Sequence, residues 1–380
     1  MAANLARMSD EDARDLDDEA PEPAAPELPS SRENPILMGH EAAEAALLSS
    51  YLSGRLPHAW LITGPRGIGK ATLAFRFARF LFAQGGAAGL FAAAPASLAI
   101  APDHPVFRRV ASGGHSDLLV VERSYDPRRK RLRTEIVVDD TRTIASFLRL
   151  TPAEGGWRIV IVDGADAMNR NAANATLKIL EEPPQRTLMM LLSENPGRLP
   201  ATIRSRCRML ALKPLPEAEV TAALRRYSPT LDPGDIAALA RLGGGSVGRA
   251  LGLAASGGLE LYRSLFRQLS RLPEIEIEDL NRLADGLARS GADDAFALAA
   301  EMLPGWLARM VELAARGGEE QAALPGEAAA MRALAGRRGL DQWVTVWENL
   351  THLFAEADWI NLDRKQVVLN AFFALEAAAR

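Results

Sequence analysis

Cysteine, histidine and long apolar runs are scarce in this chain of 380 residues. The single cysteine, Cys207, excludes an internal disulfide and is typical of a protein in a reducing compartment. One cysteine and five scattered histidines offer no ligand cluster at zinc spacing, so we expect no bound zinc. Neither a signal-peptide pattern nor an apolar run of about 18 residues is found, which predicts a cytoplasmic protein.

The chain also lacks a general excess of positive charge, because its formal net charge is −4. Charge alone therefore does not indicate nucleic acid as the main partner. Residues 1–30 hold nine acids against two arginines, with four prolines and no aromatic residue. Such a segment cannot bury enough apolar surface to fold, so we predict a disordered acidic tail over residues 1–34.

Apolar runs alternate with helical patterns through the first half of the chain. We expect strands at 58–63, 117–121, 135–139, 157–163 and 187–192, and helices at 41–53, 71–83, 143–150 and 171–181. Alternation at this spacing is typical of an α/β fold with a doubly wound parallel sheet. From Pro216 onward only helices are expected, at 216–226, 233–242 and 246–255, followed by a helical block that reaches Arg380.

A glycine-rich segment joins the first expected strand to the following helix. Residues Gly64 to Lys70 read Gly-Pro-Arg-Gly-Ile-Gly-Lys, which is the G-x-x-x-x-G-K frame of a phosphate loop. Backbone N–H groups of such a loop surround phosphate oxygens, and its lysine reaches the outer phosphates. Gly64, Gly67, Gly69 and Lys70 are therefore candidate ligands of ATP or ADP. The alternative is an eroded loop that retains only its turn geometry, because Ala71 replaces the hydroxyl that binds Mg²⁺.

The expected strand at 157–163 ends in an acid, Asp163, which is a candidate ligand for a nucleotide-bound metal. In motor ATPases an adjacent glutamate orients the attacking water, and this chain has Gly164 at that position. Asp166 is poorly placed to replace it and can also be explained as a helix cap. Ala71 and Gly164 together predict an ATPase fold that does not itself hydrolyse ATP.

Two arginines, Arg204 and Arg206, lie in the segment Leu199–Cys207, on an expected short helix at the edge of the sheet. An arginine at a domain rim can act as an arginine finger, which neutralises charge on the phosphoryl group in a neighbouring subunit. The alternative is a surface arginine paired with a carboxylate, and the spacing does not distinguish the two.

Four stretches of the chain resemble the delta-prime subunits of bacterial DNA polymerase III clamp loaders, within the wider AAA+ group. They are Gly54–Ala59, Gly64–Lys70, Asn174–Pro184 and Leu199–Cys207. The Leu-Glu-Glu-Pro-Pro run and the Ser-Arg-Cys triplet within them are specific to clamp-loader subunits. The resemblance implies an AAA+ module at 35–214, a helical lid at 215–256 and an oligomerisation collar at 257–380. Residues 84–116 hold no cysteine, so the zinc module of many family members is expected to be absent.

This resemblance also implies a function, that of a stator or assembly subunit of the loader. The loader's motor and delta subunits would be its partners in a hetero-oligomeric ring that uses ATP to place the sliding clamp on primed DNA. Arg206 would be the arginine finger given to a neighbouring ATPase site. Asn195 and Arg249 would lie at the sensor 1 and sensor 2 positions. The nucleotidyltransferase activity of the polymerase would reside in another subunit.

Other functions and contacts stay open. A motor subunit of the same loader is disfavoured by Ala71 and Gly164, and a stand-alone P-loop kinase or ATPase would need a proton acceptor that we do not find. The basic stretch Arg128–Arg133 is either a contact to DNA phosphate or a solvated hairpin tip, and we favour the hairpin tip.

Overall fold

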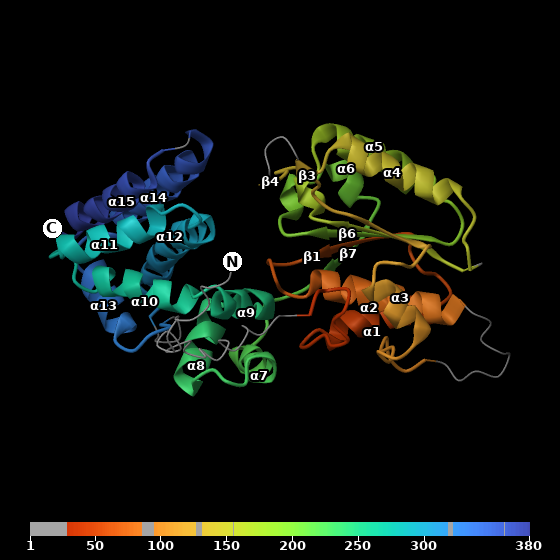
Figure 1. Cartoon of the computed structure of the whole chain (residues 1–380), viewed down its shortest axis with the longest axis horizontal. Coiled ribbons are helices and arrows are strands. Elements are labelled where there is room, and N and C mark those ends of the chain that lie inside the picture. Colours follow the sequence, from red (N-terminus) through yellow and green to blue (C-terminus); the bar gives the residue numbers. More distant parts are fainter. Residues whose placement is uncertain (1–28, 86–94, 127–130, 155, 318–321, 361) are drawn as a thin grey trace, which may run out of the picture.

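A computed structural model describes residues 29–85, 95–126, 131–154, 156–317, 322–360 and 362–380. Residues 1–28 of the expected tail and residues 127–130 of the basic stretch therefore lie outside the described part. Within it, a parallel sheet carries helices on both faces, and a purely helical region follows (Figure 1). The predicted doubly wound α/β class is confirmed.

The sheet has five strands in the order β2-β5-β6-β1-β7, and all neighbouring strands are parallel. Their bounds are Leu118–Val121 for β2, Arg158–Asp163 for β5, Thr187–Ser193 for β6, Ala59–Thr63 for β1 and Arg208–Ala211 for β7. The central strands β6 and β1 are buried along their whole length. Such runs are typical of a parallel sheet that is covered on both faces.

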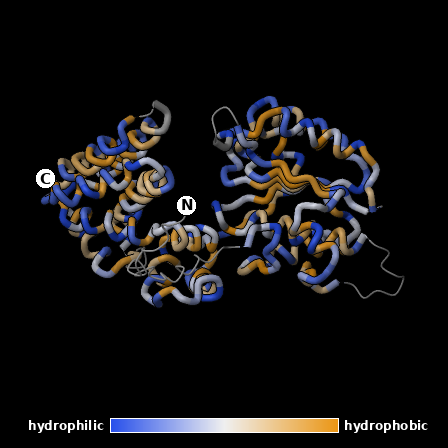
Figure 2. Tube along the Cα trace, in the orientation of Figure 1, coloured by the Kyte–Doolittle hydropathy of each residue, from blue (hydrophilic) through white to orange (hydrophobic). Residues whose placement is uncertain are grey.

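Two layers of helices cover the sheet (Figure 1). Alternate strand residues such as Trp60 and Ile161 belong to one buried cluster with Phe77, whereas Leu61 belongs to a second cluster with Ile144. The strands form an apolar band between the two layers (Figure 2). The layers are α1 (Glu41–Leu52), α2 (Lys70–Gly85) and α3 (Pro105–Ala111) on one face, and α4 (Val138–Arg149), α5 (Arg170–Glu181) and α6 (Ala201–Arg204) on the other.

The prediction of a strand at 135–139 is wrong. Ile136 makes a single bridge to Met168, and α4 already begins at Val138. The Asp140 carboxylate accepts a hydrogen bond from the Val137 N–H at 2.9 Å, so it caps the start of a helix. The acids of this segment therefore favour a helix over a further strand.

Strands β3 (Tyr125–Asp126) and β4 (Arg131–Leu132) pair antiparallel. Arg131 of the basic stretch thus belongs to a strand, and the choice between a DNA contact and a hairpin tip stays a prediction.

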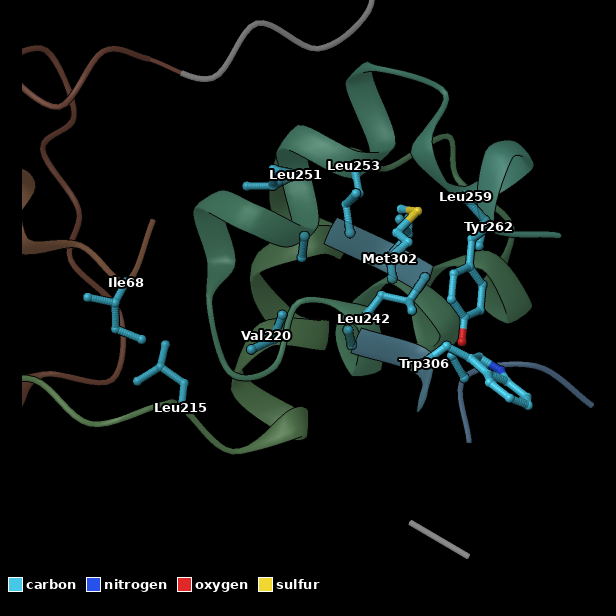
Figure 3. Close-up of a cluster of buried hydrophobic side chains, with 14 of the residues drawn as sticks. Ile68, Leu215, Val220, Leu242, Leu251, Leu253, Leu259, Tyr262, Met302 and Trp306 are labelled. Carbon is cyan, nitrogen blue, oxygen red and sulfur yellow. The ribbon is translucent and has the colours of Figure 1, made fainter. Parts of the chain in front are cut away.

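Helices alone follow the sheet. Apolar side chains from Val220 to Trp306 form a shared core of these helices (Figure 3). No helix of the described ranges has the length and apolar character needed to cross a membrane. The helices are α7 (Glu217–Tyr227), α8 (Pro233–Leu242), α9 (Val247–Ala255), α10 (Gly258–Leu269), α11 (Ile277–Ala288), α12 (Asp293–Arg316), α13 (Glu327–Ala335), α14 (Leu340–Ile360) and α15 (Arg364–Ala379).

Candidate functional site

The phosphate loop leaves β1 after Thr63 and enters α2 at Lys70. Gly64, Gly67 and Gly69 have φ values of 149°, 72° and 110°, a region of backbone conformation that side chains disfavour. The turn itself therefore requires glycine at all three predicted positions. The loop ends at a helix N-terminus, where backbone N–H groups lack helical partners and can bind an anion.

Lys70 is buried, and its ammonium folds back onto the loop. Its Nζ donates hydrogen bonds to the carbonyl oxygens of Gly64 and Pro65, each at 2.8 Å. Burial lowers the pKa of Lys70, and the nearby carboxylates of Glu194 and Asp163 oppose that shift. An ammonium has three N–H donors, so one of them remains available to a bound phosphate while these two hydrogen bonds are kept.

A cavity of about 830 Å³ opens beside the loop. Its lining includes Lys70, the predicted Asp163 at the end of β5, and three charged residues that we did not predict. These are Glu122 and Arg123 after β2 and Glu194 after β6. Burial raises the pKa of Asp163, and the charge of Lys70 opposes the shift. These residues could have been predicted from their positions just after a strand, because parallel sheets bind ligands at the carboxyl ends of their strands.

Ala71 and Gly164 also line this cavity. The next acid after Gly164, Asp166, lies in the short helix η1 (Ala165–Ala167). Its two carboxylate oxygens accept hydrogen bonds from the backbone N–H groups of Glu194, at 3.3 Å, and Asn195, at 2.9 Å. Asp166 thus holds the segment that follows β6, a role different from the helix cap that we considered.

The N-terminus of α9 lies directly against the phosphate loop. The Ser246 hydroxyl donates to the Arg66 carbonyl at 2.7 Å, and the Gly248 N–H donates to the Gly67 carbonyl at 2.9 Å. A Cβ atom added to Gly248 would lie 2.8 Å from that Gly67 oxygen. The contact between helix and loop therefore depends on glycine.

The two sensor candidates lie in different surroundings. Asn195 precedes the short helix η2 (Pro196–Arg198) and is held by Asp166 through its backbone. Arg249 lies at the start of α9, but its guanidinium pairs with Glu301 of α12 at 2.7 Å. In this structure the charge of Arg249 is therefore directed to the C-terminal helices.

Arg206 lies between α6 and β7, and it is not among the residues that line the cavity. Its Nη1 donates to the Thr202 carbonyl at 2.9 Å, and its Nη2 pairs with Oε1 of Glu181 at 2.7 Å. About a third of the side chain is exposed, at 36%. The pairing with a carboxylate that the sequence left open is therefore present, and the guanidinium still reaches the surface.

The described residues contain no group of three or more His, Cys, Asp or Glu side chains that could hold a metal ion. Next to Arg206, burial raises the pKa of the Cys207 thiol to about 11.

Known proteins match the segment that carries these features. A family model described as DNA polymerase III, delta subunit, matches residues 39–216. DNA polymerase III subunit delta' of Pseudomonas aeruginosa is 37% identical over 202 residues, which are 52% of this chain and 57% of the relative. DNA polymerase III subunit tau of Escherichia coli is 30% identical over 221 residues, which are 57% of this chain and 32% of the relative. The chain thus spans about half or less of the length of these curated relatives.

A solved DNA polymerase III gamma subunit-related protein of Thermotoga maritima is 18% identical with a TM-score of 0.41, covering 88% of this chain and 100% of that chain. The family match contains the phosphate loop, the Leu-Glu-Glu-Pro-Pro run and Arg206. Across residues 39–216 this chain is therefore similar to clamp-loader-type subunits of DNA polymerase III.

Proposed function

We propose that this chain is the stator and assembly subunit of a DNA polymerase III clamp loader, and that it donates Arg206 to the ATP site of a neighbouring motor subunit. The observation that carries this proposal is the placement of Arg206. Its guanidinium is held by Thr202 and Glu181, reaches the surface, and lies apart from the cavity of its own chain. An arginine so held is suited to neutralise charge on a phosphoryl group that another subunit binds.

The chain's own cavity supports a subunit that does not hydrolyse ATP. Ala71 offers no hydroxyl for Mg²⁺, Gly164 offers no carboxylate for water, and Asp166 is engaged with backbone N–H groups. ATP or ADP would be held by the loop from Gly64 to Lys70 and, through a metal, by Asp163. In a motor subunit such a nucleotide supplies the phosphoryl group that water attacks.

The proposed partners are the motor and delta subunits of the loader, and through the complex the sliding clamp and primed DNA. We assign residues 35–214 to the AAA+ module, 215–256 to the lid and 257–380 to the collar that joins the ring. The helices α7–α9 and α10–α15 support these divisions, and the Arg249–Glu301 ion pair connects the last two. The tail precedes this module, and within its last residues the Arg32 and Asn34 carbonyls accept hydrogen bonds from Arg79.

A motor subunit is the second candidate, because Lys70 and Asp163 do line one cavity. This candidate lacks the glutamate that would orient water next to Asp163, where the chain has Gly164. Loss of a group that positions the nucleophile costs orders of magnitude in rate.

The test compares Arg206→Ala with Arg204→Ala in a loader reconstituted from this chain and its partner subunits. Arg204 is a matched control because it is exposed and ends the short helix α6 two residues earlier. We expect Arg206→Ala to lower the clamp- and DNA-stimulated ATPase rate clearly but partially. An arginine finger raises kcat about 10³-fold or more at the one site that it serves. The loss is partial because the other ATP sites of the loader keep their rate.

Assembly of each variant is checked by size-exclusion chromatography, so that a lower rate reflects the site and not a missing subunit. Equal rates for the two variants would remove the arginine from the mechanism. ATP hydrolysis by the isolated wild-type chain would instead support the motor subunit.

A further inference from the structure

The Arg206 guanidinium is held from two separate elements. The Thr202 carbonyl belongs to α6, and the Glu181 carboxylate belongs to the last residue of α5. These acceptors contact different nitrogens of the guanidinium, Nη1 and Nη2. Two anchors on different nitrogens of a planar group restrict both its position and the direction of its plane.

These contacts leave most of the donors of Arg206 available. A guanidinium has five N–H donors, of which two suffice for Thr202 and Glu181. The Glu181 side chain is 50% exposed, and an ion pair in such surroundings adds little to stability. The pair therefore orients Arg206 while adding little to the stability of the fold.

Glu181 is itself held in place by the first strand of the sheet. The carbonyl of its neighbour Leu180 accepts a hydrogen bond from Nε2 of His58 at 3.0 Å, and the Leu180 side chain is buried. His58 immediately precedes β1, the strand that leads into the phosphate loop. Pro183 and Pro184 then prevent α5 from continuing, because proline lacks the N–H that a helix needs.

We propose that Glu181 is the positioning residue of Arg206. The bond between His58 and the Leu180 carbonyl holds the backbone at the end of α5, and from there the Glu181 carboxylate sets the direction in which the guanidinium points toward the neighbouring subunit. This inference rests on the function proposed above for Arg206. It also gives a shared physical role to three separate stretches of sequence, which contain His58, Glu181 and Arg206.

The test uses the reconstituted loader with Glu181→Ala, Glu181→Gln and, as the matched control, Glu182→Ala. Glu182 is exposed and adjacent to Glu181, so Glu182→Ala removes the same charge from a neighbouring position. We expect Glu181→Ala to lower kcat of the stimulated ATPase to a value between wild type and Arg206→Ala, with KM for ATP unchanged. The glutamine variant keeps an acceptor oxygen, so we expect it to restore part of the loss.

A double mutant separates positioning from a general effect on folding. If Glu181 acts through Arg206, then Glu181→Ala lowers kcat no further in a chain that already carries Arg206→Ala. An equal loss in both backgrounds would overturn the positioning role.

The inference and the proposed function fail in different ways. If Arg206→Ala lowers kcat but Glu181→Ala matches Glu182→Ala, the positioning role is wrong and the arginine finger stands. If Arg206→Ala itself has no effect, the proposed function is wrong.

Discussion

Single residues determine which chemistry the cavity can support. Lys70 and Asp163 line it together, yet the ammonium of Lys70 already bonds to two carbonyl oxygens of its own loop. The two small residues in its lining, Ala71 and Gly164, themselves supply neither a hydroxyl for a metal nor a carboxylate for water. We therefore propose that the loop holds phosphate through its backbone N–H groups without hydrolysing ATP.

Cys207, next to Arg206, provides a test at this scale. Burial raises its pKa from 9.0 to about 11, so at pH 8 the folded chain holds about 100-fold less thiolate than the unfolded chain. Because the thiolate is the nucleophile, we expect iodoacetamide to modify Cys207 about 100-fold more slowly in the folded chain than in urea. Mass spectrometry of timed samples measures both rates.

The direction of the pH dependence follows from the same shift. A raised pKa disfavours the thiolate, so the folded chain loses stability from this group as the pH rises above 9.0. The alkylation rate of the folded chain should keep increasing until the pH approaches 11. Similar rates in folded and unfolded chains at pH 8 would show that the thiol is not buried.

Motifs predicted some site residues and could not predict others. The G-x-x-x-x-G-K frame identified Lys70 because consecutive residues form the cradle. Glu181 and Glu194 gained roles only through contacts with residues more than 20 positions away, Arg206 and Asp166 respectively. Such contacts depend on the order of strands in the sheet, which a single sequence does not reveal.

At the scale of elements, α9 approaches the phosphate loop closely. The Gly248 N–H bonds to the Gly67 carbonyl, and the Cα of Gly67 lies 2.9 Å from where a Gly248 Cβ would be. The carbonyl oxygen and the Cα of Gly67 belong to the backbone, so they cannot move aside as a flexible side chain could. The loop and the helix must therefore shift together if either one changes.

Two glycines of α9 should respond in opposite ways to the same substitution. We expect Gly248→Ala to lower the free energy of unfolding by about 1–3 kcal/mol, because the new methyl group overlaps the loop. Gly252 has no neighbouring atom within 4 Å of an added Cβ, so Gly252→Ala should raise the free energy of unfolding by up to about 1 kcal/mol. Urea unfolding followed by circular dichroism measures both, and equal effects would contradict the close contact.

Elements with continuous apolar runs were predicted well from sequence. The strands β1, β5 and β6 are buried by helices on both faces, and such strands need no alternation of polar and apolar residues. The segment 135–139 contains a similar apolar run, but Asp139 and Asp140 form the acidic first turn of α4 instead. β7 was missed because its four residues are largely exposed at the edge of the sheet, where little apolar signal is needed.

At the scale of the whole molecule, one buried apolar cluster extends from α1 through α2 and the helices α7–α9 to α15. Figure 3 shows part of it, with Val220, Leu242, Met302 and Trp306 around the junction of α7–α9 with the C-terminal helices. A continuous close-packed core resists relative movement of the elements that share it. This continuity supports our proposal of a stator, which has to hold its neighbours while motor subunits move.

The central claim is that this chain supplies an arginine to a neighbouring site and does not hydrolyse ATP at its own. The measurement that tests it most directly is the clamp- and DNA-stimulated ATPase rate of the reconstituted loader, with Lys70→Ala and Arg206→Ala compared side by side. We predict that Lys70→Ala leaves the rate close to wild type and that Arg206→Ala lowers it clearly. A clear loss with Lys70→Ala and none with Arg206→Ala would contradict the claim and identify the chain as a motor subunit.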